Sequence, residues 1–144
     1  MVDKVSKETR SRIMGAIRSK HTKLEDRITK ELWHYGIRFR KNVRNLRGTP
    51  DIAIIKYKVV IFIDSCFWHA CKSHGHIPKS NSDFWINKFN KNLTRDIVIT
   101  NHYKNIGWNI IRIWEHEVQE DFGKTIDSIV DFIYISKRIV TREE

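Results

Sequence analysis

Residues 64–76, "DSCFWHACKSHGH", bring together side chains that can bind a metal, move a proton or stack on a base. Two cysteines, three histidines, an aspartate and a Phe-Trp pair occupy these thirteen positions. Thiolates and imidazoles are ligands that zinc prefers, and an imidazole also exchanges protons near neutral pH. The segment is therefore a candidate for a metal site, a catalytic site and a DNA contact.

The spacing of the cysteines and histidines fits a structural zinc site, which takes four ligands in a tetrahedron. Cys66, Cys71 and His74 supply three ligands from one short segment. The fourth is either the neighbouring His76 or the distant His116, at the end of the strand pattern "IIRIWEH". We favour His116, because four ligands within eleven residues would strain so short a turn. The alternative is that both cysteines are buried free thiols beside solvated histidines.

A second metal site is indicated by carboxylates at the ends of two neighbouring strand patterns. Asp51 follows a Gly-Thr-Pro turn at the start of "DIAII", and "KVVIFID" ends at Asp64 beside the cysteines. If the two strands are adjacent, Asp51, the Ile63 carbonyl and Asp64 meet as oxygen ligands of the kind that Mg²⁺ takes. Such an ion polarises the phosphate during phosphodiester hydrolysis. A Pro-Asp pair on its own more often marks a turn.

His69 lies between the two cysteines and has two interpretations. If other side chains fill the zinc site, His69 is free to act as a general base on a water, which suits its ordinary pKa. In the alternative, His69 is the zinc ligand and His74 is solvated. The spacing is compatible with both.

Phe67 and Trp68 are adjacent within the same segment, so an alternating core pattern cannot place both. Aromatic side chains exposed on a rigid, metal-bound loop can push between base pairs and kink a duplex. Trp85, in "SDFWINK", is positioned to join them. Packing in the core is an equally good interpretation of the Phe67–Trp68 pair.

Hydrophobic periodicity indicates the elements that must position these residues. Residues 6–19 read as a short basic helix, and residues 22–36 as a second helix that starts at a capping box and stops at Gly36. The box explains Glu25 as a structural residue, and Asp96 is by default one charge on a solvated helix face. The remaining predicted elements are strands near 37–43, 51–55 and 58–63, a helix at 83–106, a strand at 108–116 and a helix at 123–140. This order predicts an α/β fold with a mixed central sheet flanked by helices.

The bulk composition favours a single domain that binds nucleic acid. A chain of 144 residues with 40% hydrophobic residues suits one domain, 1–144, in which residues 1–20 form an N-terminal helical arm. Twenty-seven Lys and Arg against seventeen Asp and Glu give a net charge of +10, spread along the chain. Such a surface suits a phosphate backbone. No membrane span or signal peptide is visible, so we expect a cytosolic protein.

These motifs together resemble the very short patch repair endonucleases. The resemblance runs from about Lys7 to Val118 and rests on "GTPDIAI", "VVIFIDSCFWHACKSHGHIPKSNSDFWINKFNKN", "RD" and "GWNIIRIWEHE". It implies a restriction-endonuclease-like core of the PD-(D/E)XK superfamily, a structural zinc and an active-site magnesium. Members of that family nick one DNA strand 5′ of the thymine in a T:G mismatch, the lesion left by deamination of 5-methylcytosine. The resemblance also implies a bacterial protein of the cytosol or nucleoid.

The resemblance assigns roles residue by residue. Asp51 and the Ile63 carbonyl would hold magnesium, and His69 would be the general base. Asp96 would support His69, and Glu25 would face the metal through water; both roles replace the structural interpretations given above. The zinc ligands would be Cys66, Cys71, His74 and His116, the wedge would be Phe67, Trp68 and Trp85, and the N-terminal helix around Met14 would approach the minor groove.

The chain departs from the superfamily pattern at the second carboxylate and the lysine, which would fall at Phe62 and Asp64. The usual lysine is therefore missing, and some relatives have a histidine in place of Asp64. Asp64 is either a further magnesium ligand or a group just outside the metal shell.

Three functions fit these observations. The first is the mismatch-specific nicking endonuclease, for which we expect a monomer acting on T:G-mismatched duplex, with a functional link to a cytosine-5 methyltransferase and mismatch-repair factors. The second is a related nuclease with another DNA target, such as a restriction enzyme. The third is a zinc-stabilised DNA-binding protein without catalysis, and Asp51 and His69 argue against it because zinc needs neither.

Overall fold

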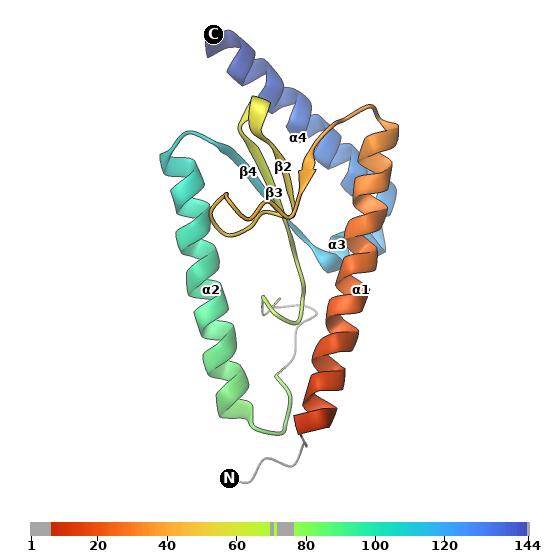
Figure 1. Cartoon of the computed structure of the whole chain (residues 1–144), viewed down its shortest axis with the longest axis vertical. Helices are drawn as coiled ribbons and strands as arrows, with labels where there is room; N and C mark the ends of the chain where they lie inside the picture. Colours follow the sequence, from red (N-terminus) through yellow and green to blue (C-terminus); the bar gives the residue numbers. More distant parts are fainter. Residues whose placement is uncertain (1–6, 70, 72–76, 144) are drawn as a thin grey trace.

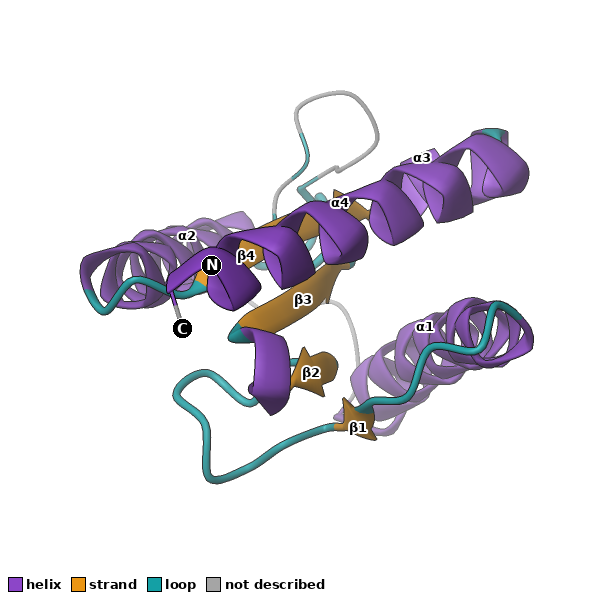
Figure 2. Cartoon of the chain, turned by 90° about the horizontal axis from the view of Figure 1, so that it is seen from above, coloured by secondary structure: helices purple, strands orange, loops and turns teal. Residues whose placement is uncertain are grey.

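The computed structural model describes residues 7–69, 71 and 77–143. In this part of the chain four strands form one sheet in the order β1-β2-β3-β4, with helices on both faces (Figures 1 and 2). The strands are β1 (Arg40–Lys41), β2 (Ile52–Ile54), β3 (Val59–Asp64) and β4 (Asn109–Trp114). The helices are α1 (Lys7–His34), a 3₁₀ turn (Ile55–Tyr57), α2 (Ser82–Asn105), α3 (Glu115–Glu120) and α4 (Phe122–Glu143). The predicted mixed sheet flanked by helices is confirmed.

Strand β3 is the centre of the sheet and carries the β-branched run "VVIFID", all of it buried. It pairs antiparallel with β2, and β2 pairs antiparallel with β1. It pairs in parallel with β4, and a parallel neighbour requires a long crossover connection, which here includes α2. Strand β3 therefore ends where chain segments from both sides of the sheet come together.

Alternation along the strands divides the core into two layers. Ile61 and Ile63 pack with residues of α1 and α4, whereas Val60 and Phe62 pack with Ile99 and other residues of α2. Figure 2 shows α1 and α2 on opposite sides of the strands. In Figure 1 these two helices run along either side of the segment that follows β3. Side chains at even positions of β3 therefore face α2.

The N-terminal region corrects one prediction. Residues 6–19 and 22–36 were expected to form two helices, but Lys7–His34 is one continuous helix. Thr22 therefore lies inside the helix and does not cap it, because a capping residue must have non-helical backbone. The intervening "SKHT" contains neither glycine nor proline, so nothing interrupts the helix. Glu25 is therefore not part of a capping box, and its interaction with Asp51 is described below.

Two other boundaries differ from the sequence prediction. The expected strand at 37–43 is reduced to Arg40–Lys41 at the edge of the sheet. The expected strand at 108–116 ends at Trp114, so His116 belongs to the first turn of the short helix α3. Helix α2 ends as predicted before Gly107, whose φ of 76° suits a residue without a Cβ. None of the described helices is long and apolar enough to cross a membrane.

Candidate functional site

The candidate site begins where β3 ends. Asp64 is the last residue of β3, and by alternation its side chain lies on the α2 side of the sheet. The chain then turns tightly: the His69 amide donates to the Ser65 carbonyl at 3.0 Å, and the Cys71 amide donates to the Cys66 carbonyl at 3.0 Å. One turn therefore presents the histidine toward α2 and the cysteines toward the end of β4.

His69 is paired with Asp96 of α2. Its Nδ1 lies 2.5 Å from Oδ2 of Asp96, and both side chains are largely buried. A carboxylate at Nδ1 fixes the ring orientation and favours a proton on that nitrogen, which leaves a lone pair on Nε2. Nε2 lies 3.8 Å from Oδ1 of Asp64, farther than a hydrogen bond reaches. Asp96 is thus a partner of the histidine and not a solvated charge on a helix face.

Asp51 lies just before β2 and joins two parts of the fold. Its Oδ2 accepts a hydrogen bond of 2.7 Å from the amide of Ile63 in β3. Its carboxyl group also shares a hydrogen bond with Glu25 of α1. Burial, followed by the interaction with Glu25, raises the pKa of Asp51 from 3.8 to about 9. Two carboxyl groups this close cannot both ionise without a compensating positive charge, so the geometry suits a cation.

Arg112 is the residue of this site that the sequence interpretation missed. It lies on β4 in register with Phe62, and its Nη1 donates to both oxygens of Asp64, at 3.0 and 3.3 Å. Its Nη2 donates to the Asp96 carbonyl at 3.3 Å, and its Nε donates to Thr100 Oγ1 at 2.8 Å. The available signal was a single arginine inside the otherwise apolar strand "IIRIW".

These groups line one pocket of about 370 Å³. Its lining includes Gly48, Asp51, Asp64, His69, Arg95, Asp96 and Arg112. Gly48 has a φ of 79°, and a Cβ there would lie 2.9 Å from the side chain of Ile99. Only glycine fits this close approach of the loop to α2. Burial also raises the pKa of Asp64, with His69 and Arg112 opposing the shift.

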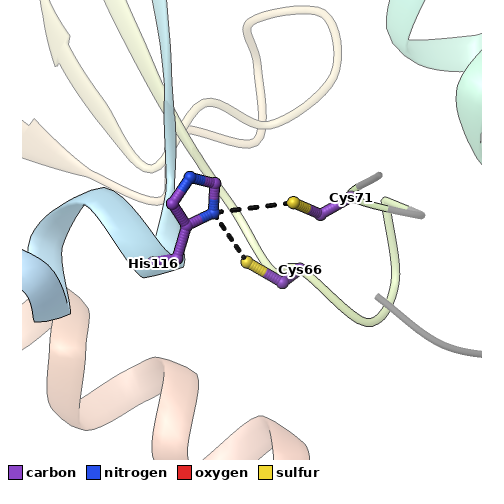
Figure 3. Close-up of side chains that lie close together, drawn as sticks. All are labelled: Cys66, Cys71 and His116. Atoms are coloured by element: carbon purple, nitrogen blue, oxygen red, sulfur yellow. Dashed lines mark hydrogen bonds between the residues drawn. The ribbon is translucent and has the colours of Figure 1, made fainter. Parts of the chain in front are cut away.

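The two cysteines converge with His116 on the other side of the same turn (Figure 3). Nδ1 of His116 lies 3.3 Å from Sγ of Cys66 and 3.5 Å from Sγ of Cys71. Ligands at the corners of a zinc tetrahedron lie about 3.6 Å apart for a sulfur and a nitrogen, so the three groups fit that ion. Burial raises the pKa of the Cys66 thiol to about 11, a shift that a bound cation would reverse. His74 and His76 lie outside the described residues.

The three aromatic residues of the predicted wedge are in contact. The ring centroids of Phe67 lie 5.0 Å from Trp68 and 5.4 Å from Trp85. Phe67 and Trp68 are partly exposed, whereas Trp85 is buried beneath them. The buried Asn92 of α2 donates from Nδ2 to the Trp68 carbonyl at 2.8 Å. Met14 is half-buried on α1, and its role toward DNA stays a prediction.

Known proteins with similar sequences are DNA endonucleases and nicking enzymes. Residues 2–74 match the family model described as "DNA mismatch endonuclease Vsr". Over 121 residues the chain is 46% identical to the type II nicking enzyme V.NmeAIP of Neisseria meningitidis, covering 83% of this chain and 86% of that protein. It is 39% identical over 136 residues to the type II nicking enzyme V.HpaIIP of Haemophilus parainfluenzae, covering 92% and 96%. It is 35% identical over 120 residues to the DNA mismatch endonuclease Vsr of Escherichia coli, covering 80% and 74%.

Proposed function

Because the chain belongs to the Vsr family of DNA mismatch endonucleases and is an endodeoxyribonuclease, we propose that it nicks duplex DNA 5′ of the thymine in a T:G mismatch. The lesion is the product of 5-methylcytosine deamination. The observation that carries the proposal is the His69–Asp96 pair, set beside the carboxylate of Asp51 in one pocket. That arrangement combines a candidate proton acceptor with a candidate cation site, which phosphodiester hydrolysis uses together.

A magnesium ion would be held by the carboxylate of Asp51 and the carbonyl of Ile63. The residues fit such an ion, because Asp51 is fixed by the Ile63 amide and its charge is otherwise opposed by Glu25. Carboxylates and carbonyl oxygens are the ligands that Mg²⁺ takes while it keeps several waters. Glu25 would accept a hydrogen bond from one of these waters. When bound, the ion polarises the phosphate and stabilises the leaving oxygen.

His69 would remove the proton from the attacking water through Nε2. Its Nδ1 is engaged by Asp96, which would stabilise the imidazolium once the proton has been taken. The oxygen of the water then attacks the phosphorus, and the bond to the 3′ oxygen of the preceding nucleotide breaks. Asp96 acts here by orienting the imidazole ring.

His69→Ala should lower the single-turnover cleavage rate by about 1,000-fold, within the range that a general base contributes. DNA affinity should stay close to that of the wild type, because His69 is a single side chain in a chain whose net charge is +10. The measurement is a rapid-mixing cleavage assay beside a fluorescence-anisotropy titration without divalent cation. Parallel losses of affinity and rate would instead indicate a structural role for the histidine.

Zinc at Cys66, Cys71, His116 and His74 would fix the turn that carries both His69 and the aromatic pair. Phe67 and Trp68 would form the wedge that opens the duplex, with the buried Trp85 packed against Phe67 as its support, and Met14 would approach from the minor groove. Unstacking a base step costs a few kcal/mol, and a mismatched pair offers less resistance. The wedge would therefore contribute to selection of the lesion. The order of β3, α2 and β4 is compatible with a PD-(D/E)XK-type core that lacks the usual lysine.

We expect magnesium-dependent nicking of a duplex with one T:G mismatch, on the mismatched-thymine strand only. The assay labels each strand separately and varies the bases that flank the mismatch, because a few side chains read this context directly. Matched T:A and C:G duplexes of the same sequence are the controls and should stay intact. The enzyme should act as a monomer, since one lesion requires one nick, and the dependence of the rate on enzyme concentration tests this.

A nuclease with another DNA target is the second candidate, favoured by the names of relatives that are type II nicking enzymes. Cleavage of the matched duplexes at a rate similar to that of the mismatched one would establish this function instead. A link to a cytosine-5 methyltransferase or to mismatch-repair factors would follow only from the first function.

A further inference from the structure

Another pocket, of about 680 Å³, lies between the edge of the sheet and helix α4, and we call it the α4 groove. It is lined by residues 36–40, 53–57, 133, 134 and 137. Some of its apolar side chains are open to solvent: Ile55 is 43% exposed and Tyr134 is 45% exposed. Exposed apolar surface in a concave site is typical of an interaction surface.

Every charged side chain that lines the α4 groove is positive, namely Arg38, Arg40, Lys56 and Lys137. The Nζ atoms of Lys56 and Lys137 lie 5.8 and 5.6 Å from the centroid of the Tyr57 ring, so ammonium groups from two elements approach one ring. Within the described part of the chain, neither lysine has an acidic partner. Cations gathered in this way favour an anionic group beside them.

The positive surface continues along α4. A neighbouring pocket of about 420 Å³ shares Tyr134 and Lys137 with the α4 groove, and its further lining residues are Arg138, Thr141 and Arg142. Neither pocket is lined by an acidic residue. The complementary ligand is therefore one that carries several negative charges together with apolar groups. A second copy of this chain does not fit that description, because its net charge is +10.

The α4 groove lies far from the pocket that holds Asp51 and His69. It adjoins the start of β3, whereas Asp64 of the other pocket ends β3, about 17 Å farther along the strand. Its buried lining belongs to the core on the α1 and α4 side of the sheet, whereas the other pocket includes Phe62 and Ile99 on the α2 side. Figure 1 shows the yellow 3₁₀ turn beside α4, at the opposite end of the strands from the turn after β3. A duplex that is cleaved at His69 therefore approaches another face of the molecule.

We propose that the α4 groove is a docking site for an acidic segment of a partner protein, in which apolar side chains lie next to aspartates or glutamates. The apolar side chains would cover Ile55 and Tyr134, and the carboxylates would pair with Lys56 and Lys137. A phosphate backbone would also pair with the lysines, but it carries no apolar side chains and would leave Ile55 and Tyr134 uncovered. Because the two sites are on different faces, DNA and the partner bind at the same time.

Selection from a random peptide library displayed on phage tests this chemistry without assuming a sequence. The target is the whole wild-type chain, and the variant Lys56→Gln with Lys137→Gln is the target for counter-selection. The recovered peptides should be rich in Asp and Glu beside Leu, Phe or Trp. Synthetic, fluorescently labelled copies of these peptides should bind the double variant about tenfold more weakly than the wild type, because charge pairs at an interface are lost.

The matched control is Lys30→Gln with Lys104→Gln, which removes the same charge from two exposed lysines outside the groove. This control should bind the peptides as the wild type does. Tyr134→Ser tests the apolar contact separately, since it changes no charge, and it should weaken peptide binding several-fold. Melting temperatures verify that each variant folds. The Lys56→Gln, Lys137→Gln variant should cleave DNA at the wild-type rate.

The proposal is wrong if no recovered peptide distinguishes the wild type from the Lys56→Gln, Lys137→Gln variant. It is also wrong if this variant loses more duplex affinity or cleavage rate than the control, because the groove would then contact the DNA substrate. Binding of a single-stranded oligonucleotide in place of acidic peptides, abolished in the same variant, would assign the groove to nucleic acid. A dimer in sedimentation experiments that the variant disrupts would assign it to a second copy. Peptide binding is measured without DNA, so its outcome is independent of the proposed cleavage specificity.

Discussion

Asp51→Asn should reduce the magnesium-dependent cleavage rate by about 10⁴-fold or more, since a metal ion supplies several kcal/mol of charge stabilisation to this step. Asparagine keeps the shape of the side chain and its hydrogen bond from the Ile63 amide. It removes only the negative charge that would hold the ion. DNA binding measured near neutral pH without divalent cation should be unchanged, because the raised pKa of Asp51, about 9, already leaves this carboxyl group protonated in the metal-free wild type.

The same substitution should stabilise the metal-free protein. Burial and Glu25 raise the pKa of Asp51 from 3.8 to about 9, so between these values the folded state retains a proton that the unfolded state has released. The free energy of unfolding therefore falls as pH rises through this window. The substituted amide does not titrate there, so the melting temperature of Asp51→Asn should exceed that of the wild type, by more at pH 8 than at pH 5.

Magnesium should reverse the order at pH 8. The ion binds the ionised carboxylate, so it should raise the melting temperature of the wild type and leave Asp51→Asn unchanged. Asp26→Asn is a suitable control, because Asp26 is exposed and pairs with Lys41 outside the pocket. A variant that loses cleavage but shows no gain in stability and still responds to magnesium would place the ion on other residues, and the proposed metal site would be wrong.

Some residues of the site could be identified from the sequence alone, and others could not. Residue types identified Asp51, His69 and the cysteines, because each belongs to a short stretch with unusual composition. Local pattern assigned Glu25 to a helix cap and Asp96 to a solvated face. Both have partners far away in sequence, Asp51 and His69 respectively, so only the resemblance to a family indicated their roles.

Arg112 was beyond both kinds of reasoning. Strand periodicity places it on the face of the sheet opposite Ile113, but neither the sheet order nor the register with Phe62 can be read from the pattern. The continuous helix α1 was missed for a related reason: the capping-box pattern is local, whereas the helix is held in place by Leu24 and Ile28 packing on the sheet. The fold class could be predicted because it depends on the order of elements and not on their exact ends.

Cys66→Ser should lower the melting temperature by roughly 10 °C or more, since a structural zinc contributes several kcal/mol of folding free energy in a chain of this size. In the wild type, Sγ of Cys66 lies 3.3 Å from Nδ1 of His116, so the ion would join the turn after β3 to helix α3. A serine hydroxyl stays protonated and is a poor zinc ligand. Without the ion, the turn after β3 and the start of α3 would no longer be held together. Calorimetry with and without a zinc chelator measures the resulting fall in melting temperature.

Three comparisons make this result specific to a metal. Cys71→Ser and His116→Ala should behave like Cys66→Ser, and none of the three should respond further to the chelator. His69→Ala, in the same turn but paired with Asp96, should keep a wild-type response to it. Cobalt substituted for zinc should give the visible absorption of a thiolate complex, weaker in either cysteine variant. An unchanged melting temperature in Cys66→Ser, with no cobalt spectrum in the wild type, would mean that the cysteines are buried free thiols and that packing alone holds the catalytic turn.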